Sequence, residues 1–550
     1  MYRQALSRRE FLKSMGASTA GLALAASGLP ALAAGASAAP RAQDAEIVLT
    51  TSGWPLVPLW TEEEVANAPD LQGYNNALQA WLDENPNVRF ERIEANIWSQ
   101  DAIIPLIAGG TAPTFVFAET IGGFSTAGTR AAFVQGLIAD VTPAIEEYGL
   151  KEKLTPGALA AWEPLTNVNG RYYNYPIDSG HQGFFYRRDL LAEAGIEDPP
   201  IDWTWDDLFN MARALTSAAD SRTGFGAPAW TIGDMLASEG FDLLSRVPTP
   251  DTPWNWSRDL TTNPEWFEIA RRFRSLVYED GAALVDTALG GNEDYAQLFI
   301  NGTIAITAQN VLSGFGGGSV REGIASVARQ LDRPYDEVIG FRGKPKGANG
   351  HVRNTTYVGG VAFNPDVTSA ELSAGVGVVD YMFLGPGWDI QKAGQYEATG
   401  DLQSVFNYPL PIDGKYEYEG VPGTFEDAYG QRTRDELTEI IAVPIPPAEA
   451  LYFPAEENVG PSSTAIDDGW SILTYDSGDV DVEAVMREAE EIWNQQAMGF
   501  SSSTPDDVFK ASAQAYYADV DAFWAETAPD FHENVFRPWY ENTVLPAISD

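Results

Sequence analysis

The sequence predicts an α/β protein with more than one lobe. Apolar, strand-like runs at 46–50, 88–90 and 115–117 alternate with stretches of helical periodicity at 74–82 and 103–108. Such alternation is typical of a mainly parallel sheet flanked by helices. The chain has 550 residues, 44% of them hydrophobic and 12% aromatic. This length exceeds one ordinary domain and favours two or three lobes with large cores.

The N-terminal segment has the pattern of an export signal. Residues 7–13 read Ser-Arg-Arg-Glu-Phe-Leu-Lys, an Ala/Gly/Leu-rich run covers 15–34, and Ala36-Ser37-Ala38 follows as a cleavage site. This order predicts a twin-arginine signal peptide over 1–38, exported by the Tat translocase and then removed. The alternative is a transmembrane anchor, which Pro30 and several glycines disfavour.

Composition narrows the compartment and the partners. The chain has no Cys, so we expect neither disulfides nor a lipid-anchoring cysteine, and a freely diffusing periplasmic protein fits best. The net charge is −44; four of the 34 basic residues and one of the 78 acidic ones lie in 1–38, which leaves 30 against 77, or −47. So acidic a surface disfavours nucleic acid and anionic membranes as partners. With only eight Lys, it also suits a saline habitat.

Later segments continue the α/β pattern. A strand is expected at 358–363, a helix at 370–383 and an amphipathic helix at 481–493, whose apolar residues share one face. Residues 499–550 have aromatic residues at helical spacing and predict a C-terminal helical extension packed on a lobe. The Gly-rich stretch 313–319 and the Pro-rich stretch 443–447 are expected as loops.

Six segments resemble a known family. They are Trp81 to Pro86 with Val88-Arg89-Phe90; Ala108-Gly109-Gly110-Thr111-Ala112-Pro113; Tyr173-Asn174-Tyr175-Pro176 with Phe184-Phe185-Tyr186-Arg187-Arg188-Asp189-Leu190; Ala194-Gly195-Ile196 with Trp203-Thr204-Trp205-Asp206-Asp207-Leu208; Phe299 to Ile306; and Gly359-Gly360. Together and in this order they resemble the family 1 extracellular solute-binding proteins of ABC sugar importers, such as maltose- and oligosaccharide-binding proteins. Thr114 and Arg187 depart from the family's usual Asp and Asn.

This resemblance implies a two-lobe periplasmic binding protein fold with hinge crossovers. The implied lobes are 45–177 plus about 350–405, and 178–349 plus about 406–498, followed by the extension. Ligand would bind between the lobes and stabilise a closed form, which docks on the membrane permease of an ABC transporter. The expected ligand is a carbohydrate, most simply an oligosaccharide. The resemblance implies no cofactor and no catalysis, and a monomer is the natural state of a closing cleft.

Candidate ligand contacts follow from position, because sugar sites combine aromatic platforms with polar side chains and lie beyond the carboxyl ends of strands. Trp54 follows the first strand and Glu119 the third. Asp178 and His181 lie just past the first predicted crossover. Further candidates are Trp230 after Gly224-Phe225-Gly226, Gln309 and Asn310 at the end of a strand at 303–308, Gly360 for close backbone approach, and Trp388 in a Gly-rich loop. Trp203, Trp205 and Tyr186 are expected to serve packing.

Other functions stay open. The same fold could bind a polyamine or a polyol, or could serve a chemoreceptor. A carbohydrate-active enzyme is the least favoured reading: the three His are far apart and no P-loop or Gly-x-Ser-x-Gly motif occurs, but two carboxylates alone can suffice for glycoside hydrolysis. Clustered acids at Asp476, Asp479, Asp481 and Glu483 are better explained as the start of a helix than as a metal site.

Overall fold

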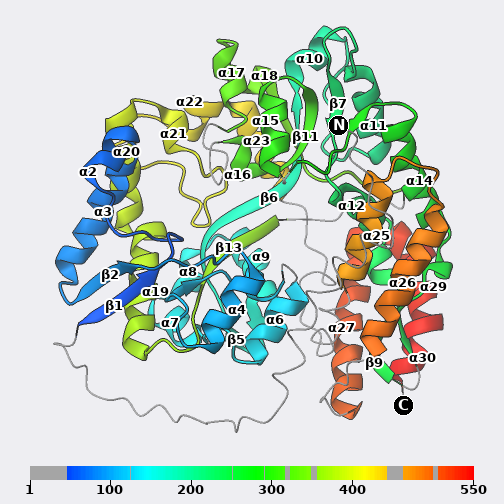
Figure 1. The fold of residues 1–550 in the computed structure, drawn as a ribbon, viewed down its shortest axis with the longest axis horizontal. Coiled ribbons are helices and arrows are strands. Elements are labelled where there is room, and N and C mark those ends of the chain that lie inside the picture. Colours follow the sequence, from blue (N-terminus) through cyan, green and yellow to red (C-terminus); the bar gives the residue numbers. More distant parts are fainter. Residues whose placement is uncertain are drawn as a thin grey trace, which may run out of the picture. The chain divides into compact units, whose positions relative to one another are not determined.

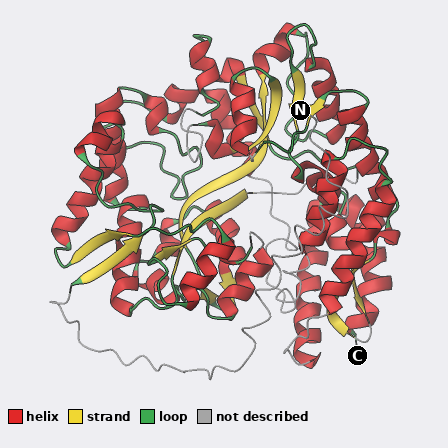
Figure 2. Cartoon of the chain, viewed as in Figure 1, coloured by secondary structure: helices red, strands yellow, loops and turns green. Residues whose placement is uncertain are grey.

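The computed structural model describes residues 46–123, 126–249, 252–289, 292–315, 323–348, 356–441, 463–498 and 506–549 (Figure 1). The predicted signal peptide and the Pro-rich stretch 443–447 lie outside these residues. Helices account for most of the regular structure (Figure 2). None of the described helices is long and apolar enough to cross a bilayer.

The strands confirm an α/β protein, with mixed rather than mainly parallel sheets. They are β1 (Ile47–Thr51), β2 (Val88–Arg92), β3 (Phe115–Val116), β4 (Asn167–Val168), β5 (Arg171–Tyr172), β6 (Tyr175–Arg187), β7 (Thr223–Gly226), β8 (Arg246–Thr249), β9 (Thr252–Arg258), β10 (Ala283–Leu284), β11 (Ile304–Asn310), β12 (Ile339–Arg342) and β13 (Thr356–Phe363). One sheet has the order β10-β7-β11-β6-β13-β3, with β12 also beside β6, and β1 pairs in parallel with β2. The β10, β7 and β11 pairs are parallel, whereas every pairing of β6 and β13 is antiparallel.

Strand β6 carries the chain from one hydrophobic core to another (Figure 1). Its first half pairs with β13 and buries Tyr175 and Ile177 in a core that also holds Leu78. Its second half pairs with β11 and β12 and buries Phe184 in a core with Trp203. Asp178 and His181 both lie in the half that pairs with β13, opposite Gly359 and Thr356.

The helices before β7 follow the predicted periodicity. The predicted helices at 74–82 and 103–108 lie within α3 and α4, and α4 ends at Gly109 followed by Gly110 with φ +67°. Thr204 caps α11 in a capping box with Asp207. The helices of this region are α2 (Glu62–Asn67), α3 (Leu71–Glu84), α4 (Gln100–Ala108), α5 (Ala118–Ile121), α6 (Thr126–Val134), α7 (Thr142–Glu147), α8 (Leu150–Lys153), α9 (Pro156–Thr166), α10 (Arg188–Glu193) and α11 (Trp205–Leu215).

The middle and late helices give one correction. Trp388 lies in the first turn of α20 rather than in a loop, because Pro386 occupies the start of a helix, where its missing N–H is not needed. The helices here are α12 (Trp230–Ala237), α13 (Phe241–Leu244), α14 (Glu265–Tyr278), α15 (Asn292–Ile300), α16 (Val311–Gly314), α17 (Ser326–Gln330), α18 (Tyr335–Val338), α19 (Ser369–Phe383), α20 (Pro386–Thr399), α21 (Leu402–Val405), α22 (Phe425–Tyr429), α23 (Gln431–Ile441), α25 (Ser463–Tyr475) and α26 (Val482–Met498).

The C-terminal extension is helical and packs on a core, as predicted. It contains α27 (Asp506–Thr527), α28 (Pro529–Phe531), α29 (Arg537–Trp539) and α30 (Leu545–Ile548), with π-helical turns between the last three. Tyr517, Trp524 and Phe536 are buried in the same core as Trp203 and Trp493. The extension therefore completes this core.

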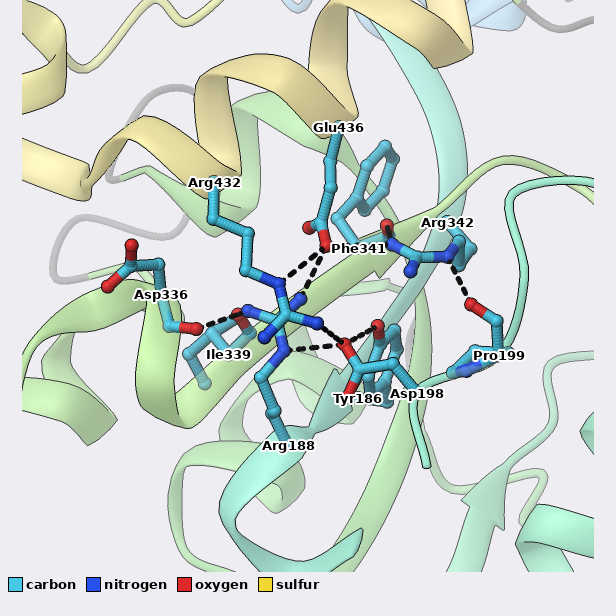
Figure 3. A network of polar contacts seen from close by, with 10 residues as sticks. All are labelled: Tyr186, Arg188, Asp198, Pro199, Asp336, Ile339, Phe341, Arg342, Arg432 and Glu436. Atoms are coloured by element: carbon cyan, nitrogen blue, oxygen red, sulfur yellow. Dashed lines mark hydrogen bonds and ion pairs between the residues drawn. The ribbon is translucent and has the colours of Figure 1, made fainter. Parts of the chain in front are cut away.

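A buried polar network joins four segments of the chain around Arg188 (Figure 3). The Arg188 guanidinium donates to Asp198 at 2.6 Å, to Glu436 at 2.6 Å and to the carbonyls of Asp336 and Ile339. Arg342, on β12, lies 3.2 Å from Glu436. Arg432, on α23, contacts both Asp198 and Glu436. The network fixes α10, β12, α18 and α23 relative to one another.

Candidate functional site

Three aromatic rings meet beyond the ends of β1, β2 and β3. Trp54 follows β1, Trp98 follows β2 and Phe117 follows β3. Their ring centroids lie 5.6 Å apart for Trp54 and Trp98, 5.2 Å for Trp54 and Phe117, and 4.9 Å for Trp98 and Phe117. Trp98 remains 51% exposed, which is costly for so large an apolar side chain. We call these residues the aromatic trio; it offers an apolar platform at the strand ends.

Two carboxyl groups interact next to the trio. Glu119 lies in the first turn of α5, two residues after Phe117, and Asp178 lies on β6. Burial, with a smaller contribution from the charge of Asp178, raises the pKa of Glu119 to about 7, against the opposing effect of its own backbone N–H. Burial also raises the pKa of Asp178 to about 6, against the opposing effect of a hydrogen bond from the Gly359 backbone. We call Glu119 and Asp178 the carboxyl pair.

Gly359 on β13 makes room for the carboxyl pair. A Cβ atom at this position would overlap Oδ1 of Asp178. At Gly360 a Cβ would lie 2.7 Å from Asn174 Cγ and 2.9 Å from the Tyr175 carbonyl oxygen. The space beside Gly360 is thus filled by the protein itself, and Gly359 is the glycine that positions a candidate ligand contact.

Gly359→Ala is therefore expected to displace the Asp178 side chain. We expect weaker ligand binding and a loss of about 1–3 kcal/mol in the free energy of unfolding, the usual range for overpacking. Titration calorimetry and urea unfolding would measure both quantities. Gly157→Ala in α9 is the control, because its added Cβ meets no atom within 4 Å. Equal behaviour of the two variants would contradict this role of Gly359.

Trp388 connects to the carboxyl pair through Tyr408. The Trp388 and Tyr408 ring centroids lie 5.4 Å apart. The pKa of Tyr408 is raised mainly by burial and, to a smaller extent, by the charge of Asp178. Lys392 Nζ lies 4.4 Å from the Trp388 ring centroid and 5.2 Å from that of Tyr408, and donates to Asn407 Oδ1 at 2.8 Å. Burial lowers the pKa of Lys392 to about 7. Trp388 itself is buried.

A second group surrounds His181. Burial and the nearby Lys344 lower the pKa of His181 to about 3, so this side chain is neutral at physiological pH. Lys344 Nζ pairs with Asp234 Oδ1 at 2.6 Å and lies 5.5 Å from the Trp230 ring centroid. Side chains alternate along a strand, so Asp178 and His181, three residues apart, lie on opposite faces of β6. The structure therefore separates two residues that the sequence placed in one cleft-facing group.

Gln309 and Asn310 belong to β11 itself, which is longer than the predicted strand at 303–308. They pair with Gly183 and Gln182 on β6. Gln309 donates to Thr307 Oγ1 at 3.4 Å and is buried, while Asn310 caps α16 by accepting from the Leu312 N–H at 3.0 Å. Both residues have structural contacts next to the second group.

The structure adds residues that the sequence analysis missed. Trp98 follows a strand, so the rule that singled out Trp54 could also have found it. Phe117 was treated only as part of its strand. Tyr408, Lys392 and Lys344 carry no local signal, because they reach the two groups through tertiary packing.

A separate small cavity lies elsewhere. It has a volume of about 100 Å³ and is lined partly by Trp205, Glu239, Arg272 and Lys346. None of the predicted ligand contacts lines it. We give more weight to the aromatic trio and the carboxyl pair, because a cavity of that size is too small for a sugar ring with its hydroxyl groups. Within the described ranges, no group of three or more His, Cys, Asp or Glu side chains could hold a metal ion.

The fold is the two-lobe α/β fold of periplasmic binding proteins. Maltose-bound MalE3 of T. maritima matches with a TM-score of 0.55 and 17% identity, over 83% of this chain and 100% of that one. The substrate-binding protein Lmo0181 of Listeria monocytogenes, in complex with cycloalternan, matches with a TM-score of 0.54 and 18% identity, over 83% and 100%.

Sequence comparisons agree with this class. The model of the family described as bacterial extracellular solute-binding protein matches residues 67–317. A binding protein of Brucella abortus (strain 2308) is 24% identical over 243 residues, 42% of this chain and 53% of that protein. The sn-glycerol-3-phosphate-binding periplasmic protein UgpB of the same strain is 24% identical over 217 residues, 37% and 45% of the two chains. The chain thus spans about half the length of the curated relatives it matches.

Proposed function

We propose that this protein is the substrate-binding component of an ABC transporter and captures a carbohydrate, most simply an oligosaccharide. The observation that carries the proposal is the aromatic trio beside the carboxyl pair. Sugars have apolar C–H faces that stack on aromatic rings and hydroxyl groups that need polar partners. Both kinds of partner occur together here.

The comparisons support the same class of ligand. The two solved structures named above hold maltose and cycloalternan, both carbohydrates. A third similar structure is a chitin oligosaccharide binding protein, with a TM-score of 0.52 and 16% identity. In the mechanism that follows, a sugar contacts side chains from both lobes and stabilises the closed form, which then docks on the permease.

The proposal includes the protein's route and organisation. Export by the Tat translocase, cleavage after residue 38, a periplasmic location without a lipid anchor and a monomeric state follow from the sequence expectations. The proposed lobes are 45–177 plus about 350–405, and 178–349 plus about 406–498. Core composition supports most of this division: one core draws on residues 49–177 and 358–412, and another on 184–308 and 466–548. A third core packs Trp388 and Val405 with Phe341, so residues 388–412 contribute to the cores of both lobes.

Thermal unfolding of the protein without residues 1–38 tests the proposal. A ligand that binds only the folded state raises the unfolding midpoint according to its affinity. We expect a shift with at least one class of oligosaccharide in a panel of malto-, chito- and raffinose-type sugars, polyols and polyamines. A shift with polyols alone would keep the fold and remove the carbohydrate assignment.

Trp230→Ala is expected to weaken sugar binding measurably, by about three- to tenfold, the upper value corresponding to about 1.4 kcal/mol. The effect is modest because one part of the ring already interacts with Lys344 and the side chain packs on a core. Titration calorimetry would measure the dissociation constant, with circular dichroism as a check on folding. An unchanged constant would remove Trp230 from the site.

A further inference from the structure

The carboxyl pair, whose two residues are half-buried, differs from the fully buried acids among the described residues. Elsewhere in the described residues, buried carboxylates have cationic partners: Asp234 pairs with Lys344, Asp189 with Arg187 at 2.5 Å, and Glu436 with Arg188. Such pairing offsets the cost of removing a charge from water. Neither Glu119 nor Asp178 forms an ion pair with a described residue.

Glu119 also has an unsatisfied oxygen. Its Oε2 atom is buried and has no hydrogen-bond partner among the described residues. Buried polar atoms in folded proteins are nearly always hydrogen-bonded, and an exception calls for an explanation. An atom of this kind, beside a second carboxyl group and the aromatic trio, is explained by a partner that arrives with the ligand.

Lys392, next to Tyr408, has other partners. Lys392 lies against the Trp388 and Tyr408 rings and donates to Asn407. Burial lowers its pKa to about 7, so much of it is uncharged near neutral pH. Among the described residues, the site thus combines two acids without a counter-ion and three aromatic rings, and aromatic faces attract ammonium groups.

We propose that the ligand carries a protonated amine, as an amino sugar does, and that its nitrogen binds between Glu119, Asp178 and the aromatic trio. The inference rests on the proposed function and narrows it to aminated carbohydrates. The ring carbons of the sugar stack on Trp54 or Trp98, and the ammonium group donates to Glu119 Oε2. Two carboxylates that repel one another when empty are both stabilised by one cation.

Titration calorimetry with three matched β-1,4-linked oligomers tests the proposal: oligomers of glucosamine, of N-acetylglucosamine and of glucose. Only the first carries a charged amine. We expect it to bind at least about tenfold more tightly than the other two, the usual strength of a hydrogen bond to a charged group. Tighter binding of either neutral oligomer would overturn the amine proposal and leave the carbohydrate function intact.

Spermidine separates the two proposals further. Binding of spermidine without binding of any oligomer would keep the cation site and overturn the carbohydrate function. If neither glucosamine oligomers nor spermidine binds, the amine proposal is wrong, whatever the neutral sugars do.

Glu119→Gln is the matching variant, because it keeps the shape and removes the charge. We expect it to weaken binding of the amine ligand at least about tenfold, while its thermal midpoint without ligand is unchanged or higher, since a buried unpaired charge is lost. The variant should also alter the pH profile. In the natural protein, affinity for the amine should rise from about pH 5 to about pH 7, because ionisation of Glu119 and Asp178 creates the charge that binds, and should fall at higher pH, where the amine of the ligand loses its own proton.

Among the described residues, the other groups that face the carboxyl pair do not reverse this sign between about pH 5 and pH 7. They are the Gly359 N–H on β13 and Tyr408, whose phenol stays neutral over this range because burial raises its pKa. Lys392, beside Tyr408, loses its positive charge as the pH rises. Its repulsion of a bound cation therefore weakens, which acts in the same direction as ionisation of the carboxyl pair. An affinity independent of pH, or a Glu119→Gln variant that binds the amine unchanged, would contradict the proposal.

Discussion

Arg188→Ala is expected to lower the free energy of unfolding by about 3–5 kcal/mol, the usual cost of removing one partner from a buried charge network. The Arg188 side chain is only 6% exposed. Its removal takes away one hydrogen-bond donor from each of Asp198, Glu436 and two backbone carbonyls. Urea unfolding followed by circular dichroism would measure the change.

Arg432→Ala is the matched control for this prediction. Arg432 contacts the same two acids, but its side chain is 50% exposed. Water solvates the acids when an exposed partner of this kind is removed, so we expect the free energy of unfolding to fall by less than about 1 kcal/mol. Similar losses for the two variants would show that burial does not determine the strength of this network.

Trp54→Ala is expected to weaken sugar binding by about 10- to 100-fold, the range for losing one aromatic stacking platform. Trp54 contacts both other members of the trio, so its removal also loosens Trp98 and Phe117. Titration calorimetry would give the dissociation constant, at a temperature where unfolding curves show the variant to be folded.

Trp54→Phe is the conservative variant in this experiment. It keeps an apolar ring at the same position and should retain binding within about tenfold. If Trp54→Ala binds as tightly as the natural protein, the aromatic trio is a packing cluster and the proposed site lies elsewhere.

Local sequence patterns predicted the secondary structure well wherever apolar residues recurred at helical spacing over a whole segment. The helices α3, α4, α19 and α26 follow their predicted ranges closely, because apolar residues at helical spacing bury one face. In α26 the residues predicted to share a face, including Val485, Met486 and Trp493, are buried together. The antiparallel pairing of β6 with β11, β12 and β13 was not predictable, because strand direction depends on how distant segments meet.

Local chemistry misled the prediction at Trp388. Gly385-Pro386-Gly387 has the composition of a loop, yet it begins helix α20. A proline suits either a turn or the first turn of a helix, and the residues that follow decide between the two. Helices α21, α22 and α23 also occupy parts of the segment 400–441, for which the sequence predicted no element.

The site was predictable in part. The rule that ligands lie beyond strand ends singled out Trp54 and Glu119, and the structure places Trp54 against Phe117, two residues before Glu119. The same reasoning grouped Asp178 with His181. Their side chains lie on opposite faces of β6, because side chains alternate along a strand. Gly359 and Tyr408 act through contacts with Asp178. Such contacts between distant segments leave no local pattern in a single sequence.

The most direct test of the account is a crystal structure of the protein with the sugar that gives the largest thermal shift. The account predicts a sugar ring within about 4 Å of Trp54 or Trp98, the usual contact distance, and a polar group of the sugar hydrogen-bonded to Glu119 or Asp178. A sugar bound only elsewhere, with both carboxyl groups untouched, would contradict the assignment of the site.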